Sequence, residues 1–369
     1  MYFVPPPFGG VADHVGLGAL MPCPQGCHPG CLSNLHHIYF VPRTCMTPQS
    51  DIPDTITAME NSHPDPPQEE PQATILKIPA TARDLPDESM QEMNFLDSSF
   101  FAKDPSRDLL TPAQVRALAT GKCRGVRPLG VIFDESKIFV KYGREATIRE
   151  AQCLWFIKRT FGDEVPVPEV YGWRVDGEEV FIYMEHIQGQ TLHNAWNELD
   201  GEDKSSLRSD LCRIITRLRQ LEQNSSDQFI AASILRTIRL NLCQKPCLFQ
   251  RSKTSMNGFS TLPQRFLPPS LKYIDPYRYI LHDDGVIKFT HADLHRENIL
   301  VSVAKPARVL ALVDWEQSGW YPDYWEYSKA LYTCWYEDEW RRDFIDHFLS
   351  PRVDEQQVFS EYATQLGAV

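Results

Sequence analysis

The sequence contains no uninterrupted apolar run of about 18 residues, so we expect no membrane-spanning helix and no membrane partner. Basic residues are also scarce, because 37 lysines and arginines face 49 aspartates and glutamates, which gives a formal net charge of -12. A nucleic-acid partner is therefore not expected, since phosphate contacts need an excess of basic side chains. The N-terminus has neither a positive segment nor a continuous apolar core, so we expect no signal peptide and a cytoplasmic protein.

The N-terminal part of the chain shows neither a helical nor an alternating pattern of apolar residues. Twelve of the 28 prolines fall within the first 70 residues, where Arg43 is the only lysine or arginine. This composition is typical of a tail or linker. We therefore predict a disordered, proline-rich extension over residues 1–95.

Three cysteines and a histidine stand close together in this extension, in the segment CPQGCHPGC. Thiolates and imidazole are zinc ligands, so Cys23, Cys27, Cys31 and His28 could form a metal site. Their C-x3-C-x3-C spacing, however, lacks the paired C-x2-C of zinc ribbons, and no second pair follows. We favour a segment without metal, with the ten cysteines of the chain as reduced thiols.

The next part of the chain shows the patterns of folded structure. Thr111 and Pro112 are typical of a helix start, with the threonine as N-cap and the proline at the first helical position. The runs GVIF and KIFVKYG predict two strands, the second of which carries Lys141. The segment ATIREAQCLWFIKRTF predicts a helix, and EEVFIYMEHI predicts a strand that ends near Glu185. We assign residues 96–187 to a small N-terminal lobe rich in β-structure.

The remaining residues, 188–369, are predicted to form a larger and mainly helical lobe. The segment DKSSLRSDLCRIITRLRQLEQ predicts a long helix with Leu207, Leu211, Ile214 and Leu218 on its apolar face. The runs VIKFT, NILVSV and RVLALVDWE predict short strands separated by loops. Strands with one helix, followed by helices with a small strand cluster, indicate an α+β fold with two lobes.

Polar side chains are concentrated in the stretch THADLHRENILVSV, residues 290–303. His291, Asp293 and Asn298 form the pattern H-x-D-x4-N before an apolar strand, and Asp314 follows the next strand. Phosphoryl transfer needs an aspartate for the attacking hydroxyl, a carboxylate and an amide oxygen for Mg²⁺, and a lysine with an acidic partner for the phosphates. Each part alone is weak, but their order together favours such a site over a solvated turn.

These segments resemble the aminoglycoside phosphotransferase and choline kinase superfamily, most of all its branch in filamentous fungi. The resemblance covers about residues 110–345, and it is carried by FTHADLHRENILV, LALVDWEQSGWYPDYWEY, VKYG, VPVPEVYGW and YMEHIQGQTL. It implies a bilobal, protein-kinase-like α+β fold with ATP bound between the lobes. It also implies transfer of the γ-phosphate of ATP to a hydroxyl group, with Mg²⁺ as cofactor.

Matching the motifs of that superfamily implies roles for residues of the polar stretch. Asp293 would be the catalytic base, and Asn298 and Asp314 would hold Mg²⁺. His291 would brace the catalytic loop. For His295, inside the loop, we favour a solvated side chain.

The same match implies nucleotide-binding residues in the small lobe. Lys141 would contact the phosphates, and Glu150, nine residues later, would pair with it. A hinge segment would present its backbone groups to adenine, and its residues are Met184, Glu185, His186 and Ile187.

The loop that would cover the phosphates departs from the kinase pattern. It contains no G-x-G-x-x-G, and its glycines are Gly121, Gly125 and Gly130. Close approach of the backbone to a phosphate normally needs glycine. We therefore keep a second hypothesis, a catalytically weak or inactive kinase-like protein that binds nucleotide and has a regulatory function.

The acceptor is predicted only as a class of compound. The short distance from Asp314 to YWEY leaves little room for a protein-kinase activation segment, which favours a small-molecule hydroxyl acceptor over a protein. The net charge of -12 favours a cationic acceptor. Five tryptophans could line a cation pocket, although helical spacing is more typical of core residues; they are Trp315, Trp320, Trp325, Trp335 and Trp340.

Overall fold

The computed structural model describes most of the chain from residue 78 onward. The described residues are 78–80, 85–119, 128–133, 136–223, 230–231, 248–249, 260–261, 264, 267–282 and 286–365. The cysteine cluster of the N-terminal segment, Gly121 and Gly125 lie outside them. All described residues belong to one unit, residues 60–368. None of the helices within them is long and apolar enough to cross a membrane.

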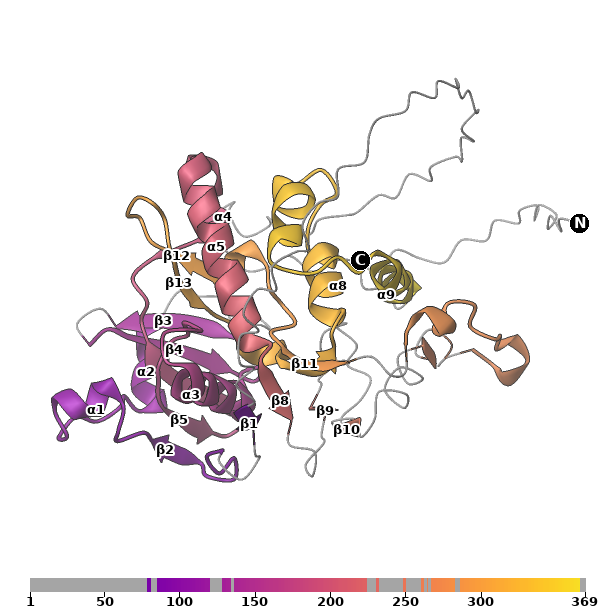
Figure 1. The fold of residues 1–369 in the computed structure, drawn as a ribbon. Coiled ribbons are helices and arrows are strands. Elements are labelled where there is room, and N and C mark those ends of the chain that lie inside the picture. Colours follow the sequence, from indigo (N-terminus) through magenta and orange to yellow (C-terminus); the bar gives the residue numbers. More distant parts are fainter. Residues whose placement is uncertain are drawn as a thin grey trace, which may run out of the picture. The chain divides into compact units, whose positions relative to one another are not determined.

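A five-stranded antiparallel sheet forms the small lobe (Figure 1). Its strand order is β2-β5-β6-β4-β3, with β2 at Glu92–Asn94, β3 at Leu129–Phe133, β4 at Ile138–Gly143, β5 at Val170–Asp176 and β6 at Glu179–Glu185. Side chains alternate between two apolar layers, so Phe181 and Tyr183 of β6 pack on one side and Ile182 and Met184 on the other. This period-two burial is what the predicted strands require.

Helix α3, Ile148–Phe161, packs against one face of this sheet. Its first turn is capped by Thr147, whose hydroxyl accepts a hydrogen bond from the Glu150 backbone amide at 3.3 Å. Two shorter helices belong to the other layer, α1 at Ser99–Lys103 and α2 at Pro112–Leu118. Thr111 caps α2 and Pro112 opens it, which confirms the helix start predicted from the sequence.

The small lobe begins earlier than the sequence indicated. Strand β2 pairs with β5 within the segment predicted to be disordered, and Trp173 Nε1 donates a hydrogen bond to the Met90 carbonyl at 2.9 Å. Further upstream, Gln152 Nε2 donates to the Pro86 carbonyl at 2.7 Å. The predicted boundary at residue 95 is therefore too late. The short strand β1, Ile78–Ala80, also pairs in parallel with β8, Leu221–Gln223.

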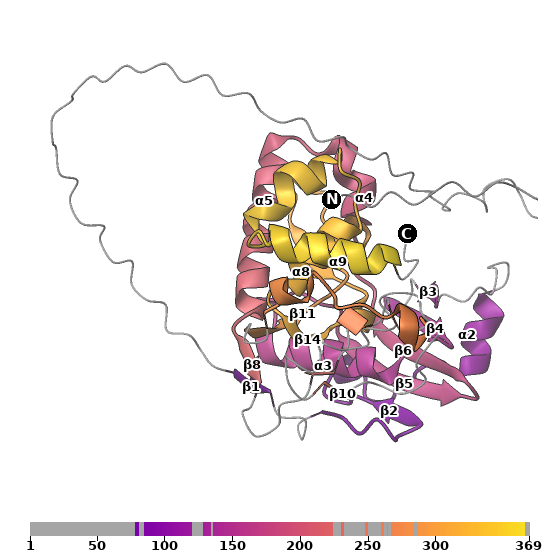
Figure 2. The same ribbon diagram turned by 90° about the vertical axis from the view of Figure 1, so that its right-hand side faces the viewer.

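The large lobe combines helices with short strands. Its helices are α4 at Leu192–Ala195, α5 at Gly201–Leu218, α8 at Trp325–Tyr332 and α9 at Val353–Gln365. Its strands form a β13-β12-β7 sheet and a β11-β14 ribbon, with β7 at Gln190–Thr191, β11 at Ile287–Thr290, β12 at Ile299–Val301, β13 at Val309–Leu312 and β14 at Gly319–Pro322. A separate short ribbon pairs β9, Ile230–Ala231, with β10, Leu248–Phe249. Figures 1 and 2 show α8 and α9 side by side.

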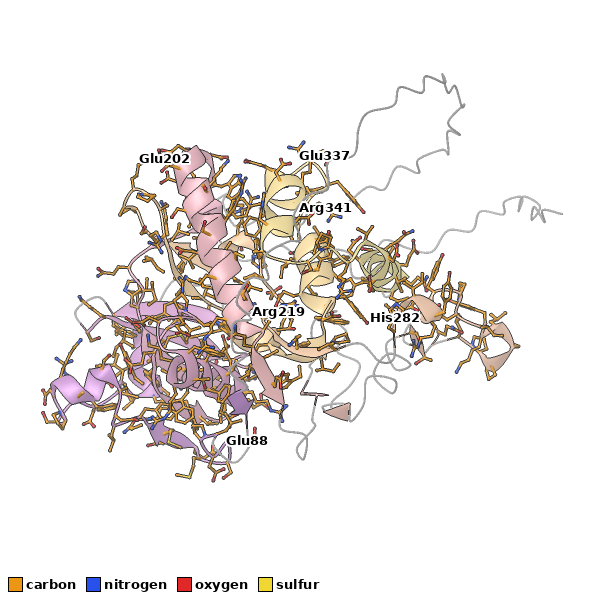
Figure 3. The ribbon with its side chains drawn as sticks, in the orientation of Figure 1. Glu88, Glu202, Arg219, His282, Glu337 and Arg341 are labelled. Carbon is orange, nitrogen blue, oxygen red and sulfur yellow. The ribbon has the colours of Figure 1, made fainter. Side chains whose placement is uncertain are left out.

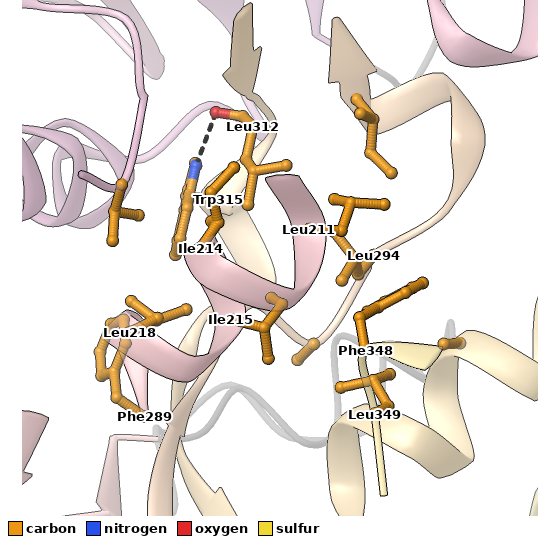
Figure 4. Packing of buried hydrophobic residues seen from close by; sticks show 14 of the residues in the cluster. Leu211, Ile214, Ile215, Leu218, Phe289, Leu294, Leu312, Trp315, Phe348 and Leu349 are labelled. Atoms are coloured by element: carbon orange, nitrogen blue, oxygen red, sulfur yellow. Dashed lines mark hydrogen bonds between the residues drawn. The ribbon is translucent and has the colours of Figure 1, made fainter. Parts of the chain in front are cut away.

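Helix α5 supplies one wall of the core of the large lobe. Figure 3 places Glu202 at one end of this helix and Arg219 just past the other. Its apolar face, including Leu211 and Ile214, packs against Leu294 of the polar stretch and against Trp315 (Figure 4). The indole of Trp315 donates a hydrogen bond to the Leu312 carbonyl at 2.9 Å.

Four of the five tryptophans considered for an acceptor pocket are core residues. Trp315, Trp320, Trp325 and Trp340 are exposed by 4% or less. For these four the pocket interpretation is wrong, and the core interpretation is confirmed. Trp335 differs, because 48% of its surface is exposed.

Replacing Leu211 by alanine tests the role of α5 as a core wall. Leu211 is fully buried, so the free energy of unfolding should fall by about 2–5 kcal/mol through lost apolar burial and a residual cavity. Urea unfolding followed by circular dichroism measures the change. The matched control is Leu118→Ala, at a leucine that is 60% exposed, which should change the value by about 0.5 kcal/mol or less. Equal effects of the two substitutions would contradict the assigned packing.

Candidate active site

Lys141 connects the two lobes through its side chain. Strand β4 directs it towards α3, where its Nζ lies 2.8 Å from Glu150 Oε1 and 2.7 Å from Glu150 Oε2. The same ammonium lies 2.7 Å from Asp314 Oδ1 and 3.7 Å from Glu316 Oε2. The structure thus brings together Lys141, Glu150 and Asp314, although up to 173 positions separate them in the sequence.

The charges around Lys141 are strongly coupled. Burial alone would lower the pKa of Lys141, but the carboxylates of Glu150 and Asp314 outweigh it and raise the pKa above its ordinary value. Burial raises the pKa of Glu150, and the lysine ammonium opposes that rise. The lysine is therefore cationic at every physiological pH and is aimed at the large-lobe carboxylates.

Asp314 occupies the turn after β13 with its backbone in the left-handed region, at φ 63° and ψ 62°. A non-glycine residue adopts this conformation only where its surroundings enforce it, at a cost of about 1–3 kcal/mol. The turn continues as a short 3₁₀ helix, η7, at Trp315–Gln317. Among the described residues, Glu150, Asp314 and Glu316 each place one carboxylate oxygen within 4.8 Å of the others. Hard oxygen donors at this spacing suit a divalent cation such as Mg²⁺.

The catalytic loop predicted from the sequence lies between β11 and β12. Its second half is a 3₁₀ turn, η6, at Arg296–Asn298, which His295 caps by accepting a hydrogen bond from the Glu297 backbone amide at 3.2 Å. The Val313 backbone amide donates to the Asn298 carbonyl at 2.9 Å. This bond and the antiparallel β12–β13 register place Asn298 across from the start of the Asp314 turn.

His291 connects the same two segments through its ring. Its Nε2 lies 3.0 Å from the Val313 carbonyl, and its Nδ1 accepts from the Asp293 backbone amide at 3.2 Å. Complete burial lowers its pKa to about 4, so the ring is neutral and carries its proton on Nε2. These contacts agree with the bracing position expected for His291.

Glu326, from helix α8, holds the backbone of the loop. Its Oε2 accepts from the His291 amide at 2.7 Å and its Oε1 from the Ala292 amide at 3.1 Å. Ala292 has a positive φ of 64°, so the loop is strained at this point. Burial raises the pKa of Glu326 to about 7. The sequence analysis did not identify this residue.

The two carboxylate oxygens of Asp293 face different neighbours. Asn298 Nδ2 donates to the Asp293 carbonyl at 2.9 Å and to Oδ2 at 3.3 Å, and His295 Nε2 lies 3.6 Å from Oδ2. Lys329 Nζ lies 4.0 Å from Oδ1. Burial would raise the pKa of Asp293, but the His295 ring and the Lys329 ammonium outweigh it and lower the pKa. His295 is half-buried against Asp293, so the prediction of a solvated side chain was wrong.

Because the amide nitrogen of Asn298 faces Asp293, its oxygen is the atom left for a metal ion. Carboxylate oxygens, such as those of Asp314 and Glu316, and amide oxygens are the hard donors that Mg²⁺ prefers, so the chemistry of these side chains fits this ion. The sequence analysis identified Asn298 and Asp314 but not Glu316. The acidic residue after Trp315 could have been noticed, since it lies two positions beyond Asp314.

The hinge segment follows directly from strand β6. Met184 and Glu185 are the last two residues of β6. The Glu185 amide donates a hydrogen bond to the Glu169 carbonyl at 2.8 Å. The His186 amide donates to the Lys137 carbonyl at 2.9 Å. The segment then leads through Ile187 into β7 and the large lobe.

Gly130 has a packing reason that is unrelated to phosphate. A Cβ atom at this position would lie 2.6 Å from Phe139 Cζ on the neighbouring strand. The other two glycines proposed for the phosphate loop lie outside the described residues. The structure therefore explains one of the three glycines by strand packing.

Comparison with protein families places the chain in a phosphotransferase family. A model described as the phosphotransferase enzyme family, APH, matches residues 144–358, which is more than half of the 369 residues. The chain belongs to this family, as its motifs indicated. Its architecture of a small β-rich lobe and a larger, mainly helical lobe is the kinase-like α+β fold predicted from the sequence. A comparison with curated proteins gave no match.

Solved structures similar to this chain include aminoglycoside phosphotransferase APH(4)-Ia, with 13% identity, a TM-score of 0.44 and coverage of 69% of this chain and 87% of that chain. A thermostable mutant of that enzyme, in ternary complex with ADP and hygromycin B, shows 12% identity and a TM-score of 0.37, with 69% and 88% covered. Plasmodium vivax ethanolamine kinase shows 13% identity and a TM-score of 0.35, with 71% and 76% covered.

Proposed function

We propose that the protein is an ATP- and Mg²⁺-dependent phosphotransferase that moves the γ-phosphate to a hydroxyl group of a small molecule. The observation that carries the proposal is the Lys141 ammonium, held 2.7 Å from both Glu150 and Asp314. The turn that carries Asp293 and Asn298 is hydrogen-bonded to the residue before Asp314. Membership of a phosphotransferase family supports the same reaction.

The small lobe would bind the nucleotide. Lys141 binds its phosphates, and Glu150 holds the lysine side chain in place. The hinge residues from Met184 to Ile187 present backbone groups to adenine. Lysine acts here as a fixed point charge, which a buried acidic partner orients.

Asn298 and Asp314 would hold Mg²⁺, with Glu316 as a further oxygen donor within reach. A bound Mg²⁺ supplies positive charge that neutralises the phosphate oxygens and the charge developing on the transferred group. The left-handed turn at Asp314 fixes where that carboxylate points before any ligand binds. Such preorganisation is where most of the catalytic effect of a phosphotransferase is expected to arise.

Asp293 would accept the proton of the attacking hydroxyl. It is ionised, because its neighbours lower its pKa, and its amide and carboxylate contacts to Asn298 fix its position. The hydroxyl oxygen then attacks the γ-phosphorus, and the bond to the β-phosphate oxygen breaks to release ADP.

The segment after Asp314 supports a small-molecule acceptor. It is occupied by η7 and by β14, which pairs with β11 from Ile287↔Pro322 to Thr290↔Gly319. Helix α8 then begins at Trp325. A protein-kinase activation segment has no place in this short, fully structured connection. The net charge of -12 favours a cationic acceptor through long-range attraction.

Thermal denaturation with nucleotide tests the binding part of the proposal. With MgATP at 100 times its Kd, the native state should gain about 2.7 kcal/mol, which raises the melting temperature by several degrees. ATP with EDTA should give a smaller rise. Asp314→Asn should abolish the difference between the two conditions, because it removes one carboxylate that binds the metal. Equal rises with and without Mg²⁺ in the unaltered protein would contradict the proposed metal site.

Turnover separates the proposed enzyme from the nucleotide-binding regulator. ADP release is measured over a panel of amino alcohols, aminoglycosides and sugars, with MgATP as donor. The enzyme should release ADP faster with at least one acceptor than with water alone, and a phosphorylated product should appear by mass spectrometry. Mg²⁺-dependent stabilisation without any such product would favour the regulator.

A further inference from the structure

Helix α8 directs two ionisable side chains into the region of the catalytic loop. Glu326 and Lys329 lie three residues apart, so they lie on the same side of the helix. Lys329 is only 4% exposed. Lysine is rarely buried to this extent unless it is paired, because removing its ammonium from water is costly.

The polar contacts of the Lys329 ammonium connect two segments of the site. Its Nζ donates to Gln317 Oε1 at 3.2 Å, on the short helix that follows Asp314. It also lies 4.0 Å from Asp293 Oδ1. One side chain therefore reaches both the carboxylate proposed as base and the turn proposed to bind metal.

The contact with Asp293, at 4.0 Å, is too long to explain the burial of Lys329 by a stabilising ion pair. A pair at 4.0 Å recovers only part of the free energy lost by burying both charges, and replacing a buried ion pair by apolar side chains of similar size is often neutral or stabilising. Burial lowers the pKa of Lys329, and the carboxylates of Asp293 and Glu326 oppose that shift. A buried charge at this place is more easily explained by a role in the reaction.

The two oxygens of Asp293 show what that role is. Asn298 and His295 hold Oδ2, whereas Lys329 is the cation that faces Oδ1. The terminal torsion of an aspartate is soft, so a carboxylate held at one oxygen alone can rotate. Lys329 limits this rotation by attracting the second oxygen.

We propose that Lys329 is a positioning residue for phosphoryl transfer, which holds Oδ1 of Asp293 in place and ties it to the metal-binding turn through Gln317. This inference rests on the proposed function. Its effect is on the orientation of the base and not on nucleotide binding, because its ammonium contacts neither Lys141 nor the hinge in the described part of the chain.

The test compares Lys329→Met and Lys329→Ala with the control Lys305→Met. Lys305 is an exposed lysine of the large lobe, paired with Asp200. ADP release is measured from MgATP alone, with water in place of the hydroxyl, and with any acceptor found above. We expect kcat of Lys329→Met to fall about 100-fold, as for a misplaced catalytic group, while the KM for ATP changes less than about threefold. Lys305→Met should retain the kcat of the unaltered protein.

Lys329→Ala adds a readout that a merely structural role would not change. Ethylamine at millimolar to molar concentration should enter the space left by the side chain and restore part of kcat, whereas sodium chloride at equal ionic strength should not. A kcat of Lys329→Met within threefold of the unaltered protein would overturn the proposal. The proposal would also be overturned if Lys329→Ala lost both its kcat and the thermal shift caused by MgATP, and if ethylamine restored neither. If the unaltered protein releases no ADP, the proposed function fails, and this inference fails with it.

Discussion

Replacing Asp293 by asparagine should reduce kcat by about 10²–10⁴-fold while MgATP still raises the melting temperature. Asparagine has nearly the same volume, and it can still accept the hydrogen bond from Asn298 through its amide oxygen. It cannot accept a proton from the attacking hydroxyl. We propose that the nucleotide is bound by Lys141 and the hinge, and the substitution changes neither of them. A coupled assay of ADP release measures kcat, and thermal denaturation measures binding.

A matched control is Asp354→Asn, on helix α9, where the aspartate is exposed. It should leave both kcat and the melting temperature unchanged within error. If Asp293→Asn retained more than a tenth of the unaltered kcat, Asp293 would not be the base. The assay must then exclude contaminating ATPase activity. The Asp314→Asn variant serves as the control, because it should be inactive when it is prepared in the same way.

Replacing Glu326 by alanine should both destabilise the protein and inactivate it. Two buried backbone amides, of His291 and Ala292, would lose their acceptor, and each unsatisfied amide costs about 1–3 kcal/mol. The strained backbone at Ala292 would then be free to relax. That relaxation would displace Asp293, which is the next residue in the chain. We expect the free energy of unfolding to fall by about 2–5 kcal/mol and kcat by at least about 100-fold. Urea unfolding and the ADP assay measure the two effects.

The substitution Glu326→Gln separates the contribution of the carboxylate charge to stability from the contribution of its hydrogen bonds. Glutamine keeps one acceptor oxygen, so the destabilisation should be smaller than for alanine. The folded pKa of Glu326, raised by burial to about 7, exceeds its ordinary value of 4.5, so the folded state binds more protons between these values. Its contribution to stability is therefore present below about pH 4.5 and is lost as the pH rises towards 7. The Glu326→Gln variant should lack this part of the pH dependence, and a full slope in it would contradict the assignment.

The residues predicted from the sequence were those whose local pattern is distinctive. The Thr111–Pro112 helix start depends on neighbouring residues alone, and the structure confirms it. Lys141 and Glu150 were proposed from a motif match, and the structure places them in contact. The roles of these side chains remain predictions, because a contact does not report turnover.

The residues that were missed lie where local pattern carries no information. In helix α8 every residue from Trp325 to Leu331 is buried, so the helix has no exposed polar face over this segment. From the sequence alone, Glu326 and Lys329 therefore look the same as charged side chains that face solvent. Their positions depend on contacts with residues 291–293 and with Gln317, which the local sequence does not encode. Strand β2 was missed for a related reason, since three residues reading Glu-Met-Asn show no apolar alternation and pair through their backbone.

The segment that connects the two lobes, residues 186–190, limits how they can move relative to each other. The His186 amide is bonded to the small lobe through Lys137, and Gln190 is already paired with Val301 in the large lobe. Any swivel of one lobe on the other at this link is thus confined to the residues from Ile187 to Gly189. Gly189 lies close against the large lobe, because a Cβ atom there would be 2.8 Å from the Val301 carbonyl oxygen. In the proposed nucleotide complex, an adenine bound at this short link would stiffen it, and the bound purine would then also limit how far the two lobes can separate.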